Sequence, residues 1–565
     1  MSIKLINILF FYFFSVISTL GYGFFFKKIF TNKNIDIDYG YCGLIGIFFL
    51  TIYSYLSHFF LKHGLIHNTI IFFIGILLFL FLLRANFKKV NLIVTCVIFL
   101  IILISFFGFK THDDFPYYHF PYTNYLTTSE IIVGVGNYDP SWRYPSSIFY
   151  FNSLFYLPVI KYFLYHIGAL LIMGFSLVTI CLKLLEKYNL KKYDQLFFYN
   201  LLSLSFILVF FYRLAEHGTD RSAQILSFIL ISEILIFFKK EQNFNTFSTK
   251  IFAIGSLAIS LKVLYLVYLI LLIPIIYFVY KEKKLADLKT VTSNPFFYFS
   301  IIFFTLIVTI NFLNSGCLMY PIMFTCFEDF SWSASLKDVL RMKTHYENWS
   351  KAGATPIFRV DNVEEYISNL NWLSGWIDRY FFNKMSDYLL GLTLLSTIFY
   401  FLFYSKKKTY QKKVNLKLLY LILVFLFLEW FYNHPSLRYG GYYIIAILIF
   451  IPLSNILSSF KNNEKNLVNK VIIILFITIS IFSYRNIDRI IKENKIYKYS
   501  PVLDVYYYID KDHHFRVERE FSNIKKFYND CTKLNVMCKN ENKLIAKKKY
   551  GRFIFIRPAK FEIKE

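Results

Sequence analysis

Long stretches of apolar residues recur along this chain and are separated by short polar segments. Most of these stretches are about 17–25 residues long, the length of helix that crosses a hydrocarbon core of about 30 Å. The pattern therefore predicts an all-α polytopic membrane protein. The predicted spans are 5–26, 41–61, 69–83, 90–109, 162–182, 195–212, 223–238, 251–280, 297–313, 387–404, 416–432, 440–457 and 468–484.

Composition supports this fold class, because the 565 residues are 56% hydrophobic and only 17% charged, whereas a soluble surface needs more charge. The net charge of +26 does not indicate nucleic-acid binding, since the lysines are concentrated in short loops between the spans. Such loops are typical of the cytoplasmic side of a membrane protein. The lysine-rich loops are 27–33, 84–89, 183–192, 239–250, 281–289, 405–415 and 461–470.

With these loops inside, segments 110–145, 213–222, 314–386 and 433–439 face outward, together with the tail after residue 485. This orientation requires 251–280 to be a helical hairpin that turns near Lys262, which gives about 14 crossings.

Three regions follow from this topology. Residues 1–89 form N-terminal transmembrane helices, 90–484 form the core with outward loops 110–161 and 314–386, and 485–565 form a soluble outward-facing tail. The amphipathic stretch 146–163 is expected to lie along the membrane interface. The alternative is an ordinary span, but one more crossing here would put the later lysine-rich loops on the opposite side of the membrane.

The cysteines agree with an outward placement of the polar loops. Cys317 with Cys326, and Cys531 with Cys538, form two close pairs in outward segments. Disulfides are expected there, because such bonds persist in oxidising compartments. Neither pair has the tight spacing of a zinc site.

Two adjacent carboxylates follow the span 90–109, in the stretch THDDFPYYHFP. Carboxylates are costly beside lipid, so Asp113 and Asp114 indicate a functional site. A carboxylate at the wall of a low-dielectric cavity has a raised pKa and is suited to accept a proton from a hydroxyl group. The alternative is a helix N-cap, which aspartate favours. Tyr117, Tyr118 and His119 follow within two helical turns and are placed to orient the same substrate.

A second polar cluster lies in YRLAEHGTDRSAQ, between two spans. Arginines bind phosphate groups in a bidentate manner, which favours a phosphate site over a salt-bridge cluster within the loop. Its members are Arg213, Glu216, His217, Asp220 and Arg221.

Two further cations are candidates for binding the same phosphate. Lys262 stands alone in an apolar run, where the alternative is that it extends to the interface. Arg438 lies at the outer end of a span, between His434–Pro435 and Gly440–Gly441, which predict a constrained turn. The aromatic residues of 314–386 are either interface anchors or part of an acceptor site. We assign no metal or cofactor, because a divalent ion at the aspartates has no firm third ligand.

The pair DD followed by YYH, in the first large outward loop after a span, resembles the GT-C superfamily of integral-membrane glycosyltransferases. The segments NYDPSWRYPSSIFYFNSLFYLP, EHGTDRSAQIL and GCLMYPIMFTCF are similar to an uncharacterised bacterial membrane-protein family grouped with those enzymes. Three spans precede the span that leads into the acidic loop here, whereas in many GT-C enzymes a single span precedes that loop.

The resemblance implies a GT-C-like bundle in the bacterial inner membrane, with its site loops facing the periplasm. It implies an inverting transfer of a sugar from a polyprenyl-phosphate donor to a cell-envelope glycan or glycolipid. Asp113 or Asp114 would be the general base, with Asp113 preferred from the sequence.

Two other functions remain open from the sequence. A polysaccharide polymerase also has many spans and a large outward loop with arginines, but needs no acidic pair directly after a span. A flippase or transporter usually carries its charges at the midplane of broken helices and often contains inverted repeats. Here the charges lie at the outer ends of spans and no repeat is visible.

Overall fold

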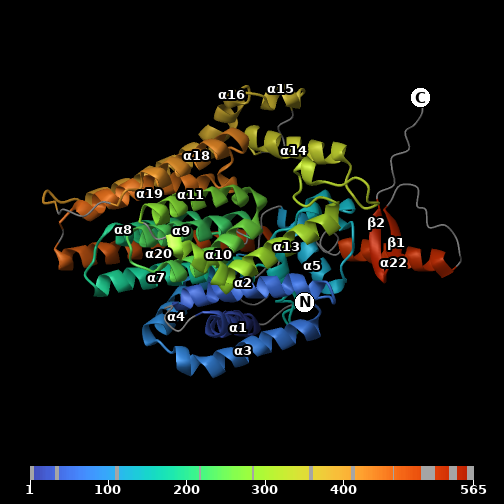
Figure 1. Ribbon diagram of the computed structural model, residues 1–565, viewed down its shortest axis with the longest axis horizontal. Coiled ribbons are helices and arrows are strands. Elements are labelled where there is room, and N and C mark those ends of the chain that lie inside the picture. Colours follow the sequence, from blue (N-terminus) through green and yellow to red (C-terminus); the bar gives the residue numbers. More distant parts are fainter. Residues whose placement is uncertain are drawn as a thin grey trace.

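The computed structural model is an almost wholly helical bundle with most helix axes along the long direction of the molecule (Figure 1). It describes residues 5–31, 37–108, 114–214, 218–282, 285–354, 360–408, 414–461, 463–497, 516–533 and 544–556.

Four helices begin the bundle: α1 (Leu5–Phe30), α2 (Tyr39–His58), α3 (Leu65–Asn86) and α4 (Lys89–Phe106). Helix α1 packs against both α2 and α3. At Gly21 and Gly23 an added Cβ would overlap backbone atoms of Gly75 and Cys42. Small residues at these positions let the helix backbones approach closely, which is how helices associate where lipid removes the hydrophobic driving force.

The central helices are α7 (Ile167–Asn189), α8 (Gln195–Phe210), α9 (Asp220–Phe238) and α10 (Phe244–Leu261). Helices α7 and α9 are almost completely buried and lie at the centre of the bundle. Asp194 and Asn243 cap α8 and α10 by accepting hydrogen bonds from backbone amides.

The hairpin predicted at Lys262 is present. Helix α10 ends at Leu261, and the chain continues as a 3₁₀ helix, η5 (Val263–Leu271), and then as α11 (Leu272–Lys281). The short α12 (Leu285–Lys289) and η6 (Thr290–Ser293) lead to α13 (Pro295–Ser315), which packs against α10. A 3₁₀ run of nine residues is unusually long.

The second half of the bundle contains α17 (Ser386–Phe403), α18 (Lys417–Asn433), α19 (Gly441–Ser459) and α20 (Glu464–Tyr497). Before it, the chain forms α14 (Leu336–Lys351), α15 (Val363–Ile367), α16 (Leu373–Trp376) and the π-helical η8 (Ile377–Met385). Helix α20 extends beyond the predicted span 468–484.

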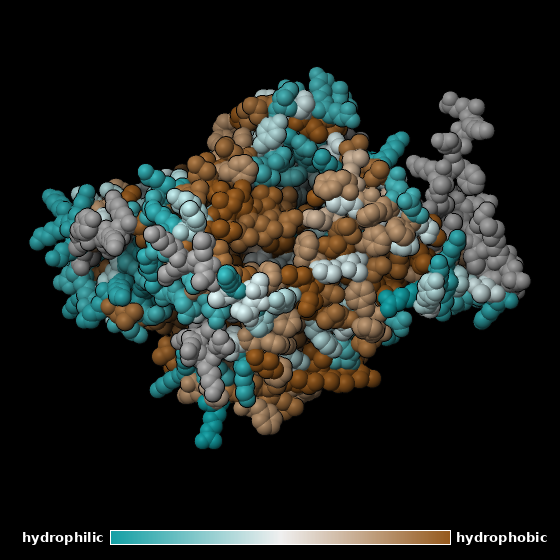
Figure 2. Space-filling view, viewed as in Figure 1, coloured by the Kyte–Doolittle hydropathy of each residue, from teal (hydrophilic) through white to brown (hydrophobic). Residues whose placement is uncertain are grey.

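Within the described residues, eleven helices are long and apolar enough to cross a membrane. Helices α8, α10 and α18 occupy three further predicted spans but are shorter or less apolar. Apolar side chains cover the middle of the molecule, and hydrophilic ones gather at its left end (Figure 2). The chain is therefore a multi-pass membrane protein, as its sequence predicts.

The segment between α4 and α7 lies at one end of the bundle, which we call the site end. It contains η1 (Phe115–His119), α5 (Phe120–Thr128), η2 (Val135–Asn137), η3 (Pro140–Arg143), α6 (Ser147–Ser153) and η4 (Tyr162–Leu164). The expectation that 146–163 lies along the membrane interface is wrong. Ile148, Phe151 and Leu157 are buried inside the protein, and α6 packs against α2, α5 and α7.

The Cys317–Cys326 disulfide is present, with an S–S distance of 2.09 Å. It closes the turn that contains η7 (Met323–Thr325) before α14. Cys538 of the predicted Cys531–Cys538 bond lies outside the described residues.

A small C-terminal unit docks at the site end (Figure 1). It consists of α22 (Arg516–Lys533) and an antiparallel hairpin of β1 (Ile545–Lys549) and β2 (Arg552–Ile556). The amide of Val133 donates to the carbonyl of Phe553 (3.0 Å), and that of Phe555 donates to the carbonyl of Val133 (2.8 Å). Phe521 packs against Trp142, so this unit supports the backbone beneath the site.

A buried charge cluster stands at the lysine-rich end. Glu233 of α9 forms ion pairs with Lys183 of α7 (2.5 Å) and Lys250 of α10 (3.4 Å), and Tyr41 of α2 donates to it. Because each charge has partners, we interpret the cluster as a structural tie between four helices.

Candidate functional site

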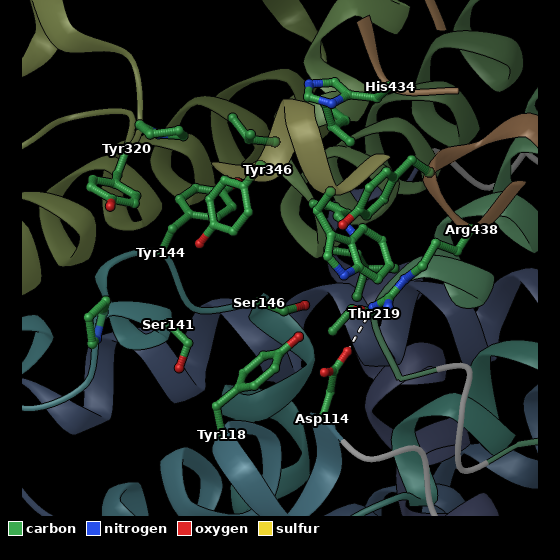
Figure 3. A pocket seen from close by; sticks show the side chains of 18 of the residues that line it. Asp114, Tyr118, Ser141, Tyr144, Ser146, Thr219, Tyr320, Tyr346, His434 and Arg438 are labelled. Atoms are coloured by element: carbon green, nitrogen blue, oxygen red, sulfur yellow. Dashed lines mark hydrogen bonds and ion pairs between the residues drawn. The ribbon is translucent and has the colours of Figure 1, made fainter. Parts of the chain in front are cut away.

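A cavity of about 360 Å³ opens at the site end, between the loop before α5, the turn after α10, helix α14 and the turn after α18. Most of its lining is apolar, but we call it the polar cavity because charged and hydroxyl-bearing side chains form part of its wall. Asp114 and Tyr118 enter it from one side, and Tyr346 and His434 from the other (Figure 3). Its lining residues are Asp114, Tyr118, Pro140, Ser141, Tyr144, Ser146, Phe149, Thr219, Leu261, Lys262, Val263, Leu264, Tyr320, Pro321, Lys343, His345, Tyr346, Trp349, His434, Arg438 and Tyr439.

Four charged side chains form a continuous network at the cavity wall. Arg438 Nη2 donates to Asp114 Oδ2 (2.9 Å), and Arg438 Nε donates to Asp220 Oδ2 (2.8 Å). Lys262 Nζ donates to the other oxygen of Asp220. The charges therefore alternate in sign from Asp114 through Arg438 and Asp220 to Lys262, which offsets much of the cost of burying them.

Each member of this network stands where a helix begins or ends. Asp220 is the first residue of α9, where a carboxylate is favoured by the helix dipole. Lys262 is the single extended residue between α10 and η5. Asp114 directly precedes η1, and Arg438 lies in the short η9 (Leu437–Tyr439).

Aromatic side chains fix the backbone that carries Arg438. Trp376 and Trp430 donate indole hydrogen bonds to the carbonyl oxygens of residues 435 and 436, at 2.8 and 2.9 Å. The hydroxyl of Tyr380 accepts a hydrogen bond from the amide of residue 437 (2.7 Å). Gly440 follows with φ +110°, a conformation that favours glycine and turns the chain into α19. The guanidinium is therefore held in a fixed position.

Burial and neighbouring charges set the protonation states around the cavity. Burial lowers the pKa of Lys262 to about 8, although Asp220 acts in the opposite direction. Burial also opposes the charge on Arg438, but Asp220 and Asp114 raise its pKa well above the ordinary value. Arg438 therefore stays charged at every accessible pH, whereas the charge on Lys262 depends on pH near neutrality.

Two uncharged side chains add hydrogen-bonding capacity. Burial, with a further contribution from Asp114, raises the pKa of Tyr118 well above its ordinary value, so its phenol remains protonated. Burial lowers the pKa of His434 to about 4, so its ring is neutral at pH 7. Among the described residues, His434 Nδ1 is a buried atom with no hydrogen-bond partner.

The structure brings together only some of the residues predicted from the sequence. Asp114, Tyr118, Lys262 and Arg438 line the cavity, and Asp220 lies directly behind it. Asp113, Glu216 and His217 lie outside the described residues.

Four other candidates do not line this cavity. Arg221 stacks on the ring of Tyr442, with its Cζ 3.8 Å from the ring centroid. Arg213 is exposed and lies over the neighbouring ring of Tyr212. Tyr117 is 60% exposed, and His119 packs on Phe149 beside a separate small space.

Sequence reasoning did not single out most of the cavity's aromatic wall. Tyr144, Tyr346, Trp349 and Tyr439 line it, and so does His434. The aromatic segment 314–386 was an available signal, and α14 from that segment does cover the cavity. Among the described residues, no group of three or more His, Cys, Asp or Glu side chains is arranged to hold a metal ion.

A bundle of apolar helices with a charged, partly enclosed cavity at one end defines a multi-pass membrane protein with a candidate binding site. The family model described as a domain of unknown function (DUF8201) matches residues 5–445, most of the chain, and the chain belongs to this family. The match includes the whole charge network. No curated protein and no solved structure matches the chain.

Proposed function

We propose that this protein is a membrane glycosyltransferase that moves a sugar from a polyprenyl-phosphate donor to a cell-envelope glycan or glycolipid. The observation that carries the proposal is a carboxylate, Asp114, beside two cations, Lys262 and Arg438, in one cavity at the end of an apolar bundle. Since the lysine-rich loops at the opposite end are typical of the cytoplasmic side, the cavity would face outward, toward the periplasm of a bacterial inner membrane.

The cations suit the phosphate group of the donor. A guanidinium and an ammonium group bind phosphate oxygens through charge-assisted hydrogen bonds. Asp220 contacts both cations from behind, so their positions are set before substrate arrives. Such preorganisation lowers the cost of stabilising charge that develops on the leaving phosphate.

The aromatic wall suits the sugars. Tyr144, Tyr346 and Trp349 present flat apolar faces to the cavity, and phenol and indole groups also supply hydrogen bonds. Trp349 lies near the phosphate-binding end, with Arg438 Cζ 5.4 Å from its ring centroid.

The reaction needs one base and one leaving group. Asp114 accepts the proton of the acceptor hydroxyl, whose oxygen forms a bond to the anomeric carbon of the donor sugar. The bond from that carbon to the phosphate oxygen breaks, and polyprenyl phosphate leaves with the electron pair. Attack from the opposite face inverts the anomeric centre. A phosphate bound to Arg438 would offset the positive charge that acts on Asp114, which raises the pKa of the carboxyl and makes the carboxylate a stronger base once donor is present.

The proposal is tested with purified protein in lipid nanodiscs, a radiolabelled polyprenyl-phosphate sugar and envelope glycolipid extract. We expect transfer of label to the extract with release of polyprenyl phosphate. Elongation from a polyprenyl-diphosphate oligosaccharide would indicate a polymerase instead, and movement of intact donor across a vesicle membrane without cleavage would indicate a flippase.

We expect donor binding to weaken as the pH rises above about 8. Burial lowers the pKa of Lys262 to about 8, so its positive charge is present below that pH and is lost above it. The donor phosphodiester keeps a constant charge over this range. Binding is measured in nanodiscs between about pH 6.5 and 9.5. Lys262→Arg keeps its charge and should remove the decline; an equal decline in this variant would contradict the assignment.

A further inference from the structure

A second cavity, largely apolar and about 370 Å³ in volume, lies between α9, α10, η5, α11 and α13. Isoleucine, leucine and phenylalanine side chains form most of its wall, and Gly255 of α10 lies on its floor. Its rim includes Leu269 (48% exposed), Leu272 (40%) and Phe304 (42%). These side chains belong to helices that are apolar enough to span the membrane, so the groove opens on a surface that faces lipid.

The apolar groove adjoins the polar cavity. Residues 261–264 line the polar cavity, and residues 265, 266, 268, 269, 271 and 272 of the same segment line the groove. The two meet near Gly440, which follows Arg438 and Tyr439 in the chain. A Cβ added at Gly440 would lie 3.8 Å from the hydroxyl of Tyr265.

The junction also holds an unused polar group. Tyr265 is 1% exposed, and its hydroxyl has no hydrogen-bond partner among the described residues. A buried hydroxyl without a partner is costly, so a ligand that accepts its hydrogen bond would be stabilised at this junction. An apolar chain alone has no atom that could accept this hydrogen bond, whereas the ester oxygens at the head of a lipid phosphate could accept it.

We propose that the groove holds the hydrocarbon chain of a lipid phosphate whose phosphate group lies between Lys262 and Arg438. The inference rests on the lipid-linked donor of the proposed function and adds where its chain lies. A groove of this volume admits one extended chain, but not a protein helix about 10 Å across. The cations match the phosphate, and Tyr265 donates to an ester oxygen where head and chain meet.

The groove acts by giving the chain a path rather than by hydrophobic attraction. A chain that moves from bilayer to groove exchanges one apolar environment for another and gains little hydrophobic free energy. If the groove is filled, the chain of a long-chain ligand bound in the polar cavity can no longer run through the groove to the bilayer. A ligand with a short chain should still bind, because its chain does not need this path.

Gly255→Phe tests this path. An added Cβ at Gly255 has no atom within 4 Å, so the ring enters the groove without displacing backbone. We expect binding of a long-chain polyprenyl phosphate to weaken at least about tenfold, equivalent to about 1.4 kcal/mol. Binding of geranyl phosphate, with two isoprene units, should remain unchanged. Binding is measured in nanodiscs without any sugar transfer.

Thr305→Phe is the matched control, because Thr305 is exposed on α13 and does not line the groove. It should leave the binding of both lipids unchanged. A polyprenyl phosphate with a photoreactive group in its chain should label α10, α11 or α13 in the unmodified protein, which tests the path even if Gly255→Phe does not fold.

The outcomes separate this inference from the proposed function. Equal affinity of Gly255→Phe and unmodified protein for the long-chain lipid, or labelling confined to other helices, would overturn the groove assignment even if sugar transfer is observed. Loss of long-chain binding alone in Gly255→Phe would support the groove even if no sugar is transferred.

Discussion

Asp114→Asn is expected to reduce sugar transfer at least about 100-fold, the typical contribution of a positioned general base. The amide cannot accept the proton of the acceptor hydroxyl. Donor binding should persist, because Lys262 and Arg438 remain paired with Asp220. The loss should therefore appear in kcat, with little change in the affinity for polyprenyl phosphate.

Asp139→Asn is a matched control for this variant. Asp139 lies next to Pro140 and Ser141 of the cavity wall but does not line the cavity, and it accepts a hydrogen bond from the amide of Ser141 (2.9 Å). An asparagine keeps that acceptor, so transfer should be unchanged. Asp113→Asn tests the other member of the pair. Full transfer by Asp114→Asn, with normal expression, would show that Asp114 is not the base.

Most of the helical bundle can be predicted from the sequence, because the bilayer constrains it in two ways. The apolar runs must be long enough to cross the hydrocarbon core, and the lysine-rich loops must lie on one side of it. The turn at Lys262 is an example, since only a hairpin there keeps the lysine-rich loops on one side. The stretch 146–163 shows the limit. An amphipathic pattern indicates one apolar face, but that face packs equally well on protein or on lipid, and here Ile148 and Phe151 are buried in protein.

The site, too, could be predicted from the sequence only in part. Asp114, Lys262 and Arg438 are recognisable because charges are costly beside long apolar runs. Their convergence is not recognisable, since Asp114 and Arg438 are 324 residues apart. Tyr144 gives no distinct signal in a chain that is 21% aromatic. Arg221 is of a residue type that binds phosphate, but its stacking on Tyr442 is visible only in the structure.

Arg438→Met is expected to cause the largest loss of stability in the network. Arg438 binds two carboxylates through different nitrogens, and its removal leaves buried Asp220 with Lys262 as its remaining cation. Breaking a buried ion pair from one side costs about 3–5 kcal/mol, and we expect the lower part of that range because Lys262 remains. Thermal unfolding in nanodiscs measures the change. Arg438→Lys should recover only part of the stability, because one ammonium group does not reproduce the fixed geometry of the guanidinium.

The double variant Arg438→Met with Asp220→Asn separates stability from function. Removing the uncompensated carboxylate should restore much of the thermal stability, since the two residues share one network and their effects are not additive. Binding of polyprenyl phosphate should remain weak, because the guanidinium that holds the phosphate is still absent. Restored lipid binding in the double variant would mean that Arg438 serves only to neutralise Asp220. Equal instability of the single and double variants would mean that the ion pair contributes little to folding.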